Sequence, residues 1–428
     1  MKTRNSLTLA IFGVTGDLYQ NKLASSLFNL FSNGFLPSEF KIVGFARRPL
    51  TNEEFRNFTK EAISKKNKIP DQKTLSSFLE KLQYLQGDLE NLESFKDLSH
   101  TLSEKDKELG FCSNKLFYLA VPPNLYESIF NNISKAGLTI PCAPGLRDKD
   151  GAWTRVLVEK PFGRDMAGAI KLDKMLGELF DESQVFRIDH YLGKEALRNI
   201  LSFRFEHGEL EHKWNKENIQ KIRILFYEED IVGKRGALYE NLGILRDVGQ
   251  NHMLQMLALV TMENPGGTSM DTIRDSRQKA LEQTDLNEEK KIIRGQYKGY
   301  LNEKGVNPDS KTETFFRFFL KMKNKRWEGV EFELEGGKAL DKSEVVIEVH
   351  FKNQDKPHKF LISGYGGIGE EAYEKVLYDC ISGDQTIFTT TGEILAEWRI
   401  VERVIEKWQS EPLKIYNQGT SPEMINEY

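Results

Sequence analysis

The first half of the chain alternates short apolar runs with stretches of helical spacing. Five such runs read as strands, each followed by a helix-like segment: residues 7–12, 40–46, 115–121, 155–160 and 184–188. Strands that alternate with helices form a parallel sheet with helices on both faces. The sequence therefore predicts an α/β fold that opens with a Rossmann-like, doubly wound dinucleotide-binding domain over residues 1–195.

The second half has a different pattern. Residues 219–228 and 344–351 alternate or run apolar as antiparallel strands do, and long helical stretches cover residues 247–262 and 391–408. This combination indicates an α+β domain over residues 196–428, with a large, mainly antiparallel sheet covered by helices.

The charge of the chain limits its partners. Sixty basic and 64 acidic residues leave a net charge of −4, so neither nucleic acid nor an anionic membrane is expected as the main partner. No apolar stretch approaches the ~20 residues of a membrane span, and the first apolar run is too short for a signal peptide. These features favour a cytoplasmic protein.

Cysteine and histidine spacings argue against structural metal sites and cross-links. Cys112, Cys142 and Cys380 are an odd set at wide spacings, from which we expect neither a disulfide framework nor a paired-cysteine zinc site, but a reducing compartment. His207 and His212 have a spacing that a metal could use, but no further array of carboxylates and histidines completes a site. We expect no metal.

A glycine turn follows the first predicted strand. In "GVTGDLYQNKL", Gly13 and Gly16 would let the backbone approach a pyrophosphate at the start of the next helix. The spacing differs from G-x-G-x-x-G, so an ordinary strand–turn–helix explains it equally well, and its place in the alternating series favours the site. Arg47 and Arg48 stand at the end of the second strand. They either lie at a solvated edge of the sheet or bind the 2′-phosphate of NADP. NADP is the better prediction.

The segment "RIDHYLGKE" (187–195) places many charged side chains between a strand and a helix, where open α/β sheets bind ligands. Lys194 lies four residues from His190, so both can converge on an anion such as phosphate, and Tyr191 adds a third donor. A carboxylate beside a phosphate is repulsive. Asp189 is therefore expected to orient His252 of "RDVGQNHMLQM" as a general base.

These residues resemble the glucose-6-phosphate dehydrogenase family, whose signature is RIDHYLGKE. The similarity extends over essentially the whole chain through "GVTGDL", "YLAVPP", "VEKPFG" (158–163), "RDVGQNH" (246–252), "GKAL" (337–340), "EAYEKVLYD" (371–379) and "AEWRIVERVIEKW" (396–408). It implies oxidation of β-D-glucose 6-phosphate to 6-phosphogluconolactone with NADP, NAD being the weaker alternative. It also implies that the domain over residues 196–428 serves substrate binding and oligomerisation, and that the protein is a homodimer or homotetramer.

The resemblance assigns roles residue by residue. His252 would take the proton from the anomeric hydroxyl, with Asp189 orienting it. The substrate would be bound by Lys160, His190, Tyr191, Lys194, Glu228, Asp247 and Lys338. The coenzyme would be bound by Gly13, Thr15, Gly16, Asp17, Leu18, Arg47, Asp88, Leu89 and Lys160. A neutral imidazole with an unperturbed pKa of about 6.5 suits proton abstraction at cytoplasmic pH.

The chain departs from the family pattern at a few places. It is shorter, with the shortage expected around residues 351–369, and residues 141–153 resemble a surface insertion. Ser343 stands where a second basic substrate residue is usual, which Lys342 could replace. Gly249 stands where a larger apolar residue is usual.

Two other functions fit parts of the pattern. The first is an NAD(P)-dependent oxidoreductase acting on another sugar or sugar phosphate; an unphosphorylated sugar would leave His190, Tyr191 and Lys194 without a purpose, because these residues suit a phosphate. A non-catalytic dinucleotide-binding regulator is expected to lack the base or its orienting acid, and both His252 and Asp189 are present.

Overall fold

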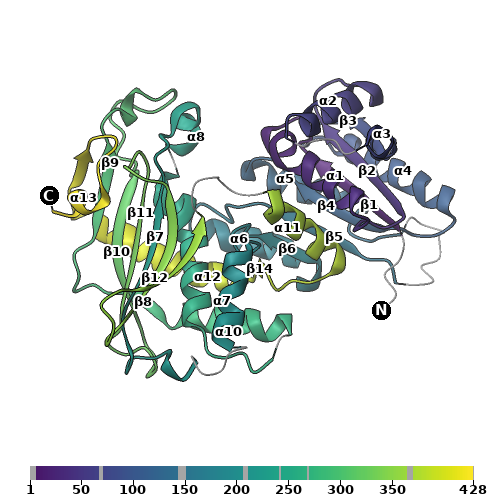
Figure 1. The fold of residues 1–428 in the computed structure, drawn as a ribbon. Helices are drawn as coiled ribbons and strands as arrows, with labels where there is room; N and C mark the ends of the chain where they lie inside the picture. Colours follow the sequence, from purple (N-terminus) through teal and green to yellow (C-terminus); the bar gives the residue numbers. More distant parts are fainter. Residues whose placement is uncertain are drawn as a thin grey trace. The chain divides into compact units, whose positions relative to one another are not determined.

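Two compact units make up the chain in the computed structural model (Figure 1). The structure describes residues 6–66, 71–142, 151–205, 211–240, 242–267, 269–363 and 370–427. The first unit comprises residues Met1–Phe162, Ile170–His190 and Gly369–Thr389, and the second comprises Gly163–Ala169, Tyr191–Ile368 and Thr390–Tyr428. The chain therefore passes from one unit to the other inside the RIDHYLGKE segment, between His190 and Tyr191.

The first unit contains the predicted parallel sheet. Its strand order is β14-β6-β5-β4-β1-β2-β3, and only β14 runs antiparallel, against β6. The strands are β1 (Ser6–Phe12), β2 (Glu39–Ala46), β3 (Leu82–Gln86), β4 (Asn114–Leu119), β5 (Thr154–Val158), β6 (Val185–Ile188) and β14 (Phe388–Thr389). Every residue of β1 and β4 is buried, as expected for central strands covered on both faces. The Rossmann-like fold class is confirmed.

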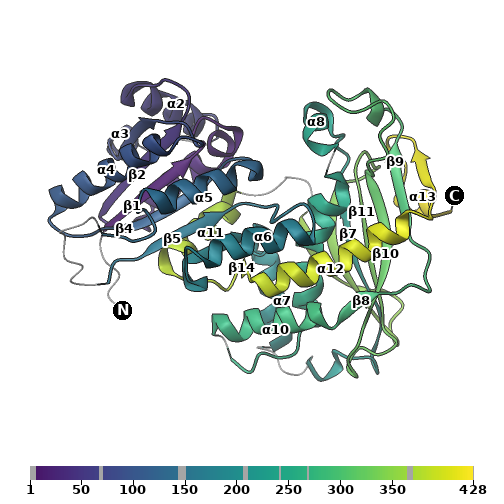
Figure 2. The same ribbon diagram turned by 180° about the vertical axis from the view of Figure 1, so that it is seen from behind.

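Helices lie on both faces of this sheet. Figure 1 shows α1 and α11 in front of it, and Figure 2, from behind, shows α4 and α5. The helices are α1 (Ala24–Ser32), α2 (Asn52–Ser64), α3 (Gln72–Leu79), α4 (Leu92–Leu109), α5 (Tyr126–Lys135), α6 (Met166–Gly177) and α11 (Glu370–Ser382), with a π-helical turn η1 (Tyr19–Leu23) and 3₁₀ turns η2 (Pro123–Leu125) and η3 (Glu182–Gln184). Thr51 caps α2 as predicted, in a capping box with Glu54.

The C-terminal half of the chain contributes α11 and β14 to the first unit. Helix α11 packs beside α1, where the Asn29 amide donates to Glu374 at 2.6 Å. Sequence periodicity could not place these elements, because it reports which face of a helix is buried and not which distant segment covers it.

The second unit contains an eight-stranded sheet in the order β13-β12-β7-β11-β10-β9-β15, with β8 paired to β10. Its pairs are antiparallel except β7 with β11 and β9 with β15, which confirms the predicted mainly antiparallel sheet. The strands are β7 (Ile219–Tyr227), β8 (Thr284–Leu286), β9 (Ile293–Tyr297), β10 (Phe315–Met322), β11 (Glu331–Gly337), β12 (Glu344–Phe351), β13 (His358–Ser363) and β15 (Leu413–Tyr416).

Helices cover one face of this second sheet, and α12 crosses it from behind in Figure 1 and in front in Figure 2. The helices and helical turns of the second unit are α7 (Glu195–Phe205), α8 (Gly236–Tyr239), α9 (Leu254–Thr261), α10 (Met270–Glu282), α12 (Thr391–Trp408), α13 (Pro422–Glu427), the π-helix η6 (Leu245–Met253) and 3₁₀ turns η4 (Glu211–Lys213), η5 (Gly233–Arg235) and η7 (Tyr300–Asn302). No helix in the described part of the chain is both long and apolar enough to span a membrane.

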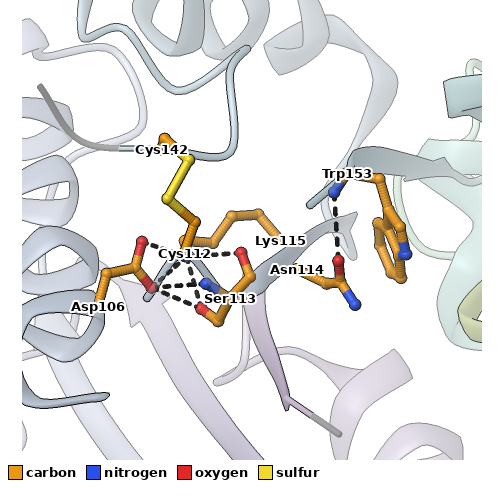
Figure 3. Close-up of a disulfide and its surroundings, with 7 residues drawn as sticks. All are labelled: Asp106, Cys112, Ser113, Asn114, Lys115, Cys142 and Trp153. Carbon is orange, nitrogen blue, oxygen red and sulfur yellow. Dashed lines mark hydrogen bonds and ion pairs between the residues drawn. A yellow bond between two sulfur atoms is a disulfide. The ribbon is translucent and has the colours of Figure 1, made fainter. Parts of the chain in front are cut away.

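A disulfide joins Cys112 to Cys142, with the two Cα atoms 5.2 Å apart (Figure 3). The spacing argument against disulfides was therefore wrong for this pair. The end of α4 and the segment after α5 come together only in the folded unit, which sequence spacing does not reveal. Cys380 is buried as a free thiol, and burial raises its pKa. His207 and residues 143–150, the centre of the expected insertion, lie outside the described residues.

Candidate active site

The glycine turn after β1 lies very close to the backbone that follows β4. Gly13 has φ +85°, and a Cβ there would lie 2.5 Å from the carbonyl oxygen of Ala120 at the end of β4, so only glycine fits. Its amide donates to the carbonyl of Phe45 at 2.8 Å. The helical segment that follows starts at Asp17, and both Gly16 and Asp17 are exposed, while Thr15 and Leu18 are half-buried. The turn thus presents a helix start at the edge of the sheet.

Neighbouring strand ends complete this edge. Phe12 of β1 pairs with Phe45 of β2, and Phe45 pairs with Leu85 of β3, so Arg47 and Asp88 follow strands that end side by side with β1. The Arg47 guanidinium is exposed and makes no ion pair with any described residue. The phenol of Tyr84 anchors the backbone at this point by donating to the carbonyls of Ala46 and Arg48.

Asp88 and Leu89 lie in the turn after β3. The Asp88 carboxylate is exposed and accepts from the amide of Glu90 at 3.0 Å, while Leu89 is buried and its carbonyl accepts from Asn132. Both residues stand at the same edge of the sheet as Gly13. The three positions assigned to the coenzyme from three strands therefore come together in the first unit.

Lys160 follows β5 at this edge, next to a buried carboxyl group. Glu159 accepts from the Tyr118 phenol at 2.6 Å, and the Tyr126 phenol donates to the Glu159 carbonyl at 2.9 Å. Burial raises the pKa of Glu159 to about 7, although its hydrogen bonds and Lys160 act in the opposite direction. Sequence reasoning selected Lys160 and missed the acid beside it.

Tyr373 is a second residue that sequence reasoning missed. Its phenol hydrogen-bonds Glu159, and its ring stacks on the imidazole of His190, with centroids 5.9 Å apart and planes at 14°. Tyr373 comes from α11, more than 180 residues after His190. The motif "EAYEKVLYD" is the signal that could have drawn attention to it, because its Tyr belongs to a segment already matched to the family.

The RIDHYLGKE segment divides between the units. Asp189 and His190 directly follow β6 in the first unit and are both buried, whereas Tyr191 and Lys194 belong to the second unit. Within the second unit, the Tyr191 ring lies 4.3 Å from the imidazole of His252, centroid to centroid, and the Lys194 ammonium lies 3.9 Å above the Tyr191 ring. The pairing of Asp189 with His252 stays a prediction.

His252 lies in a π-helix, not in the regular helix predicted for residues 247–262. In the π-helix η6, backbone hydrogen bonds join residues i and i+5, so two residues five positions apart lie about one turn from each other on the same side of the helix. Asp247 and His252 are separated by five residues and therefore face the same side. An α-helix would instead align neighbours three or four apart. His252 is 1% exposed, which protects its imidazole from bulk water.

The remaining substrate candidates gather around Lys338 in the second unit. Lys338 is buried and forms an ion pair with Glu228. Its ammonium lies 5.8 Å above the ring of Tyr239, and the carboxylates of Asp247 and Glu228 are near enough to help raise the Tyr239 pKa, after burial itself. Tyr239 was missed; its hydroxyl has no hydrogen-bond partner among the described residues.

The departures from the family pattern have structural explanations. A Cβ at Gly249 would lie 2.9 Å from Leu245 and 3.0 Å from the Phe316 ring, so these two side chains occupy the space that a larger residue would need. Ser343 accepts from the amide of Glu229 at 2.9 Å. Lys342 is half-buried, and its ammonium lies 3.9 Å from the Glu423 carboxylate; that Lys342 takes the role of the basic residue absent at position 343 stays a prediction.

The Rossmann-like unit, the glycine turn and the α+β unit define a nicotinamide-dependent oxidoreductase. The family model described as "Glucose-6-phosphate dehydrogenase, NAD binding domain" matches residues 10–199, and the one described as "Glucose-6-phosphate dehydrogenase, C-terminal domain" matches residues 201–365 and 362–428. The chain belongs to the glucose-6-phosphate dehydrogenase family. The two C-terminal matches meet within residues 351–369, the stretch where a shortage is expected.

Known proteins resemble the chain over nearly its whole length. It is 34% identical to the cytoplasmic glucose-6-phosphate 1-dehydrogenase 6 of Arabidopsis thaliana, covering 94% of this chain and 86% of the relative. The enzyme of Chlamydia pneumoniae is also 34% identical, with 98% and 91% covered. A solved glucose-6-phosphate dehydrogenase in complex with its substrate superposes with a TM-score of 0.88 at 31% identity, covering 99% of this chain and 96% of that one.

Proposed function

We propose that this chain oxidises β-D-glucose 6-phosphate to 6-phosphogluconolactone with NADP, the first step of the pentose phosphate pathway. The observation that carries the proposal is the contact between Tyr191 of the signature segment and His252, both buried in the second unit. It brings a proposed phosphate-binding side chain against the proposed base. Family membership supplies the substrate.

The first unit fits NADP. Gly13 lets the turn after β1 pack against Ala120, which follows β4, directly before a helical segment whose N-terminal amides could receive a pyrophosphate, and Arg47 offers an exposed guanidinium at the adjacent strand end for a 2′-phosphate. The dinucleotide would be held by Gly13, Thr15, Gly16, Asp17, Leu18, Arg47, Asp88, Leu89 and Lys160. When bound, the nicotinamide accepts the hydride from the anomeric carbon.

The substrate would be held at both ends. His190, Tyr191 and Lys194 bind the phosphate, which supplies binding energy far from the reacting carbon and so orients the sugar. At the sugar end, Glu228, Asp247 and Lys338 pair carboxylates with an ammonium, a suitable match for hydroxyls that both donate and accept. Lys160 stands between sugar and coenzyme.

His252 performs the proton transfer. Removal of the hydride leaves positive charge on the anomeric carbon, so the hydroxyl proton must leave for the lactone carbonyl to form. The His252 imidazole takes that proton, and Asp189 orients the ring and stabilises its protonated form. Burial of His252 limits competition from water.

We also propose a cytoplasmic homodimer or homotetramer without nucleic-acid or membrane partners. Relatives described as cytoplasmic support the location, and the net charge of −4 agrees with a small-molecule substrate.

One assay tests the function. Purified protein is mixed with glucose 6-phosphate or glucose and with NADP or NAD, while the absorbance of the reduced nicotinamide is followed. We expect rapid reduction only with the phosphorylated sugar, and faster with NADP. Equal rates with glucose would favour an oxidoreductase for unphosphorylated sugars, and no reduction with any combination would contradict the proposal.

A further inference from the structure

Residues 312–314, which lead into β10, bond to three segments that carry or adjoin candidate site residues. The Thr312 hydroxyl donates to the carbonyl of Glu240 at the end of α8, at 2.6 Å. Glu313 contacts the start of η6, and the Thr314 carbonyl accepts from the amide of Lys338 at 2.9 Å. Three consecutive residues thus link the neighbouring stretches at Glu240 and residues 244–245 to Lys338, which lies far along the chain.

Glu313 caps the N-terminus of η6, although it is distant from η6 in the sequence. No side chain at the N-cap position of η6 supplies a hydrogen bond, so its first amides need acceptors elsewhere. The Glu313 carboxylate accepts from the amide of Leu245 at 3.0 Å, and the Glu313 carbonyl accepts from the amide of Ile244 at 3.1 Å. A negative side chain also stabilises the positive end of a helix.

The turn before η6 is shaped around this carboxylate. Gly243 has φ +68°, and a Cβ at this position would lie 2.2 Å from the Glu313 side-chain oxygen, so glycine lets the backbone pass. Glu313 is 6% exposed, and burial raises its pKa to about 7 against the opposing effect of its hydrogen bonds and of Arg246. Burial of an ionisable group destabilises the fold unless the group is hydrogen-bonded, and the bond from the η6 amide partly offsets this cost.

The backbone of Lys338 is held by Thr314 and Tyr416. Thr314 is fully buried, and its carbonyl accepts from both the Lys338 amide and the Tyr416 phenol, which also donates to the Lys338 carbonyl at 2.7 Å. The next residue, Ala339, has φ +53°, a conformation that non-glycine residues rarely adopt. Such backbone persists only where surrounding bonds enforce it.

We propose that Glu313 is a positioning residue of the active site, which holds the start of η6, and with it Asp247 and His252, in register with Lys338. This inference rests on the proposed function for its kinetic test but not for its structural one. Glu313 touches no reacting atom. It acts through the π-helix, where a small displacement would misalign the base and the sugar-binding carboxylate together.

The kinetic test compares Glu313→Gln with Glu313→Ala in the full-length protein. The amide oxygen of Gln can accept the same bond from Leu245, so we expect kcat for glucose 6-phosphate within about threefold of wild type; Ala should lower kcat by about tenfold or more, with KM for NADP unchanged. Equal kcat in the folded Ala variant, or an equal loss in both variants, overturns the proposal.

A control separates positioning from general stability. Glu393→Ala removes another buried carboxylate of the second unit, one that caps α12 and pairs with Arg277. We expect it to lower the melting temperature while kcat stays within about twofold. A loss of kcat as large as that of Glu313→Ala would assign the effect to stability and refute the positioning role.

Hydrogen exchange tests the same inference without any substrate. Amides of residues 245–249 should exchange about tenfold faster in Glu313→Ala than in wild type, while those of α12 are unchanged. Unchanged exchange at residues 245–249 refutes the inference even if the enzyme is active. Conversely, a wild-type protein that does not oxidise glucose 6-phosphate refutes the proposed function and leaves the exchange result to judge Glu313.

Discussion

The imidazole of His252 and the phenol of Tyr191 lie ring against ring, 4.3 Å between centroids and tilted by 32°. The two residues are 61 positions apart in the chain, and both are at most 5% exposed. The Lys194 ammonium lies above the Tyr191 ring, so two of the three proposed phosphate-binding residues form one packed cluster with the proposed base. Substrate binding and proton transfer should nevertheless be separable by mutation.

Replacing His252 by Asn should abolish most turnover. Asn keeps a polar side chain of similar bulk but cannot take a proton at neutral pH, and general-base catalysis contributes about 10²–10⁴-fold. We therefore expect kcat to fall by about that factor with little change in KM for glucose 6-phosphate. Steady-state kinetics measure both. Unchanged turnover would show that another group is the base.

Replacing His190 by Ala should instead weaken substrate binding. Loss of one donor to the phosphate removes a charge-assisted hydrogen bond of about 1.5–3 kcal/mol, or about 10- to 100-fold in KM. The slow activity expected toward glucose, which lacks the phosphate, should not change. Tyr373→Phe is the matched control, because it keeps the ring stacked on His190 and removes only the phenol bonded to Glu159. A larger effect on kcat than on KM would argue against phosphate binding by His190.

Arg47→Ala should reduce the preference for NADP. A guanidinium pairs with a 2′-phosphate that NAD lacks, so kcat/KM should fall by about tenfold or more with NADP and remain the same with NAD. Lys60→Ala, an exposed cation of the same unit on α2, serves as the control and should leave both values unchanged. Parallel losses with both coenzymes would contradict a role specific to the phosphate.

Glu159 should make stability depend on pH. Burial raises its pKa from 4.5 to about 7. Between these values the folded protein keeps a proton that the unfolded chain has released, so the folded state loses stability as pH rises, and above about 7 the full penalty of about 3 kcal/mol applies.

Glu159→Gln does not titrate and should escape this loss. The free energy of unfolding of the variant, minus that of wild type, should therefore increase by about 2.5 kcal/mol between about pH 5 and about pH 8. Urea unfolding at a series of pH values measures the difference. A difference that stays constant or decreases with pH would show that Glu159 is not held protonated by burial.

The disulfide should stabilise the oxidised protein. Cys112 and Cys142 are separated by 30 residues, and closing such a loop in the unfolded chain contributes about 3–4 kcal/mol. Reduction should lower the melting temperature of wild type and leave that of Cys142→Ser unchanged. Mass spectrometry of alkylated peptides verifies the bond. Free thiols at both positions in air-oxidised protein would contradict the structure.

Local pattern was enough to predict much of this protein. Alternating apolar runs indicated the parallel sheet, because a strand buried on both faces must be apolar throughout. The glycine turn and Arg47 could be assigned to one site because each follows a strand of the parallel sheet, and parallel strands end at a common edge. The signature segment and "RDVGQNH" are sufficient to indicate the family.

Other features depend on contacts between residues far apart in the chain. The stacking of Tyr373 on His190, the cap that Glu313 places on η6 and the Cys112–Cys142 bond each join segments whose separation carries no periodic signal. The π-helical winding that aligns Asp247 with His252 is also invisible in an apolar pattern that suits an ordinary helix. Periodicity records only whether a side chain is buried; its neighbours there are selected by how the whole chain packs.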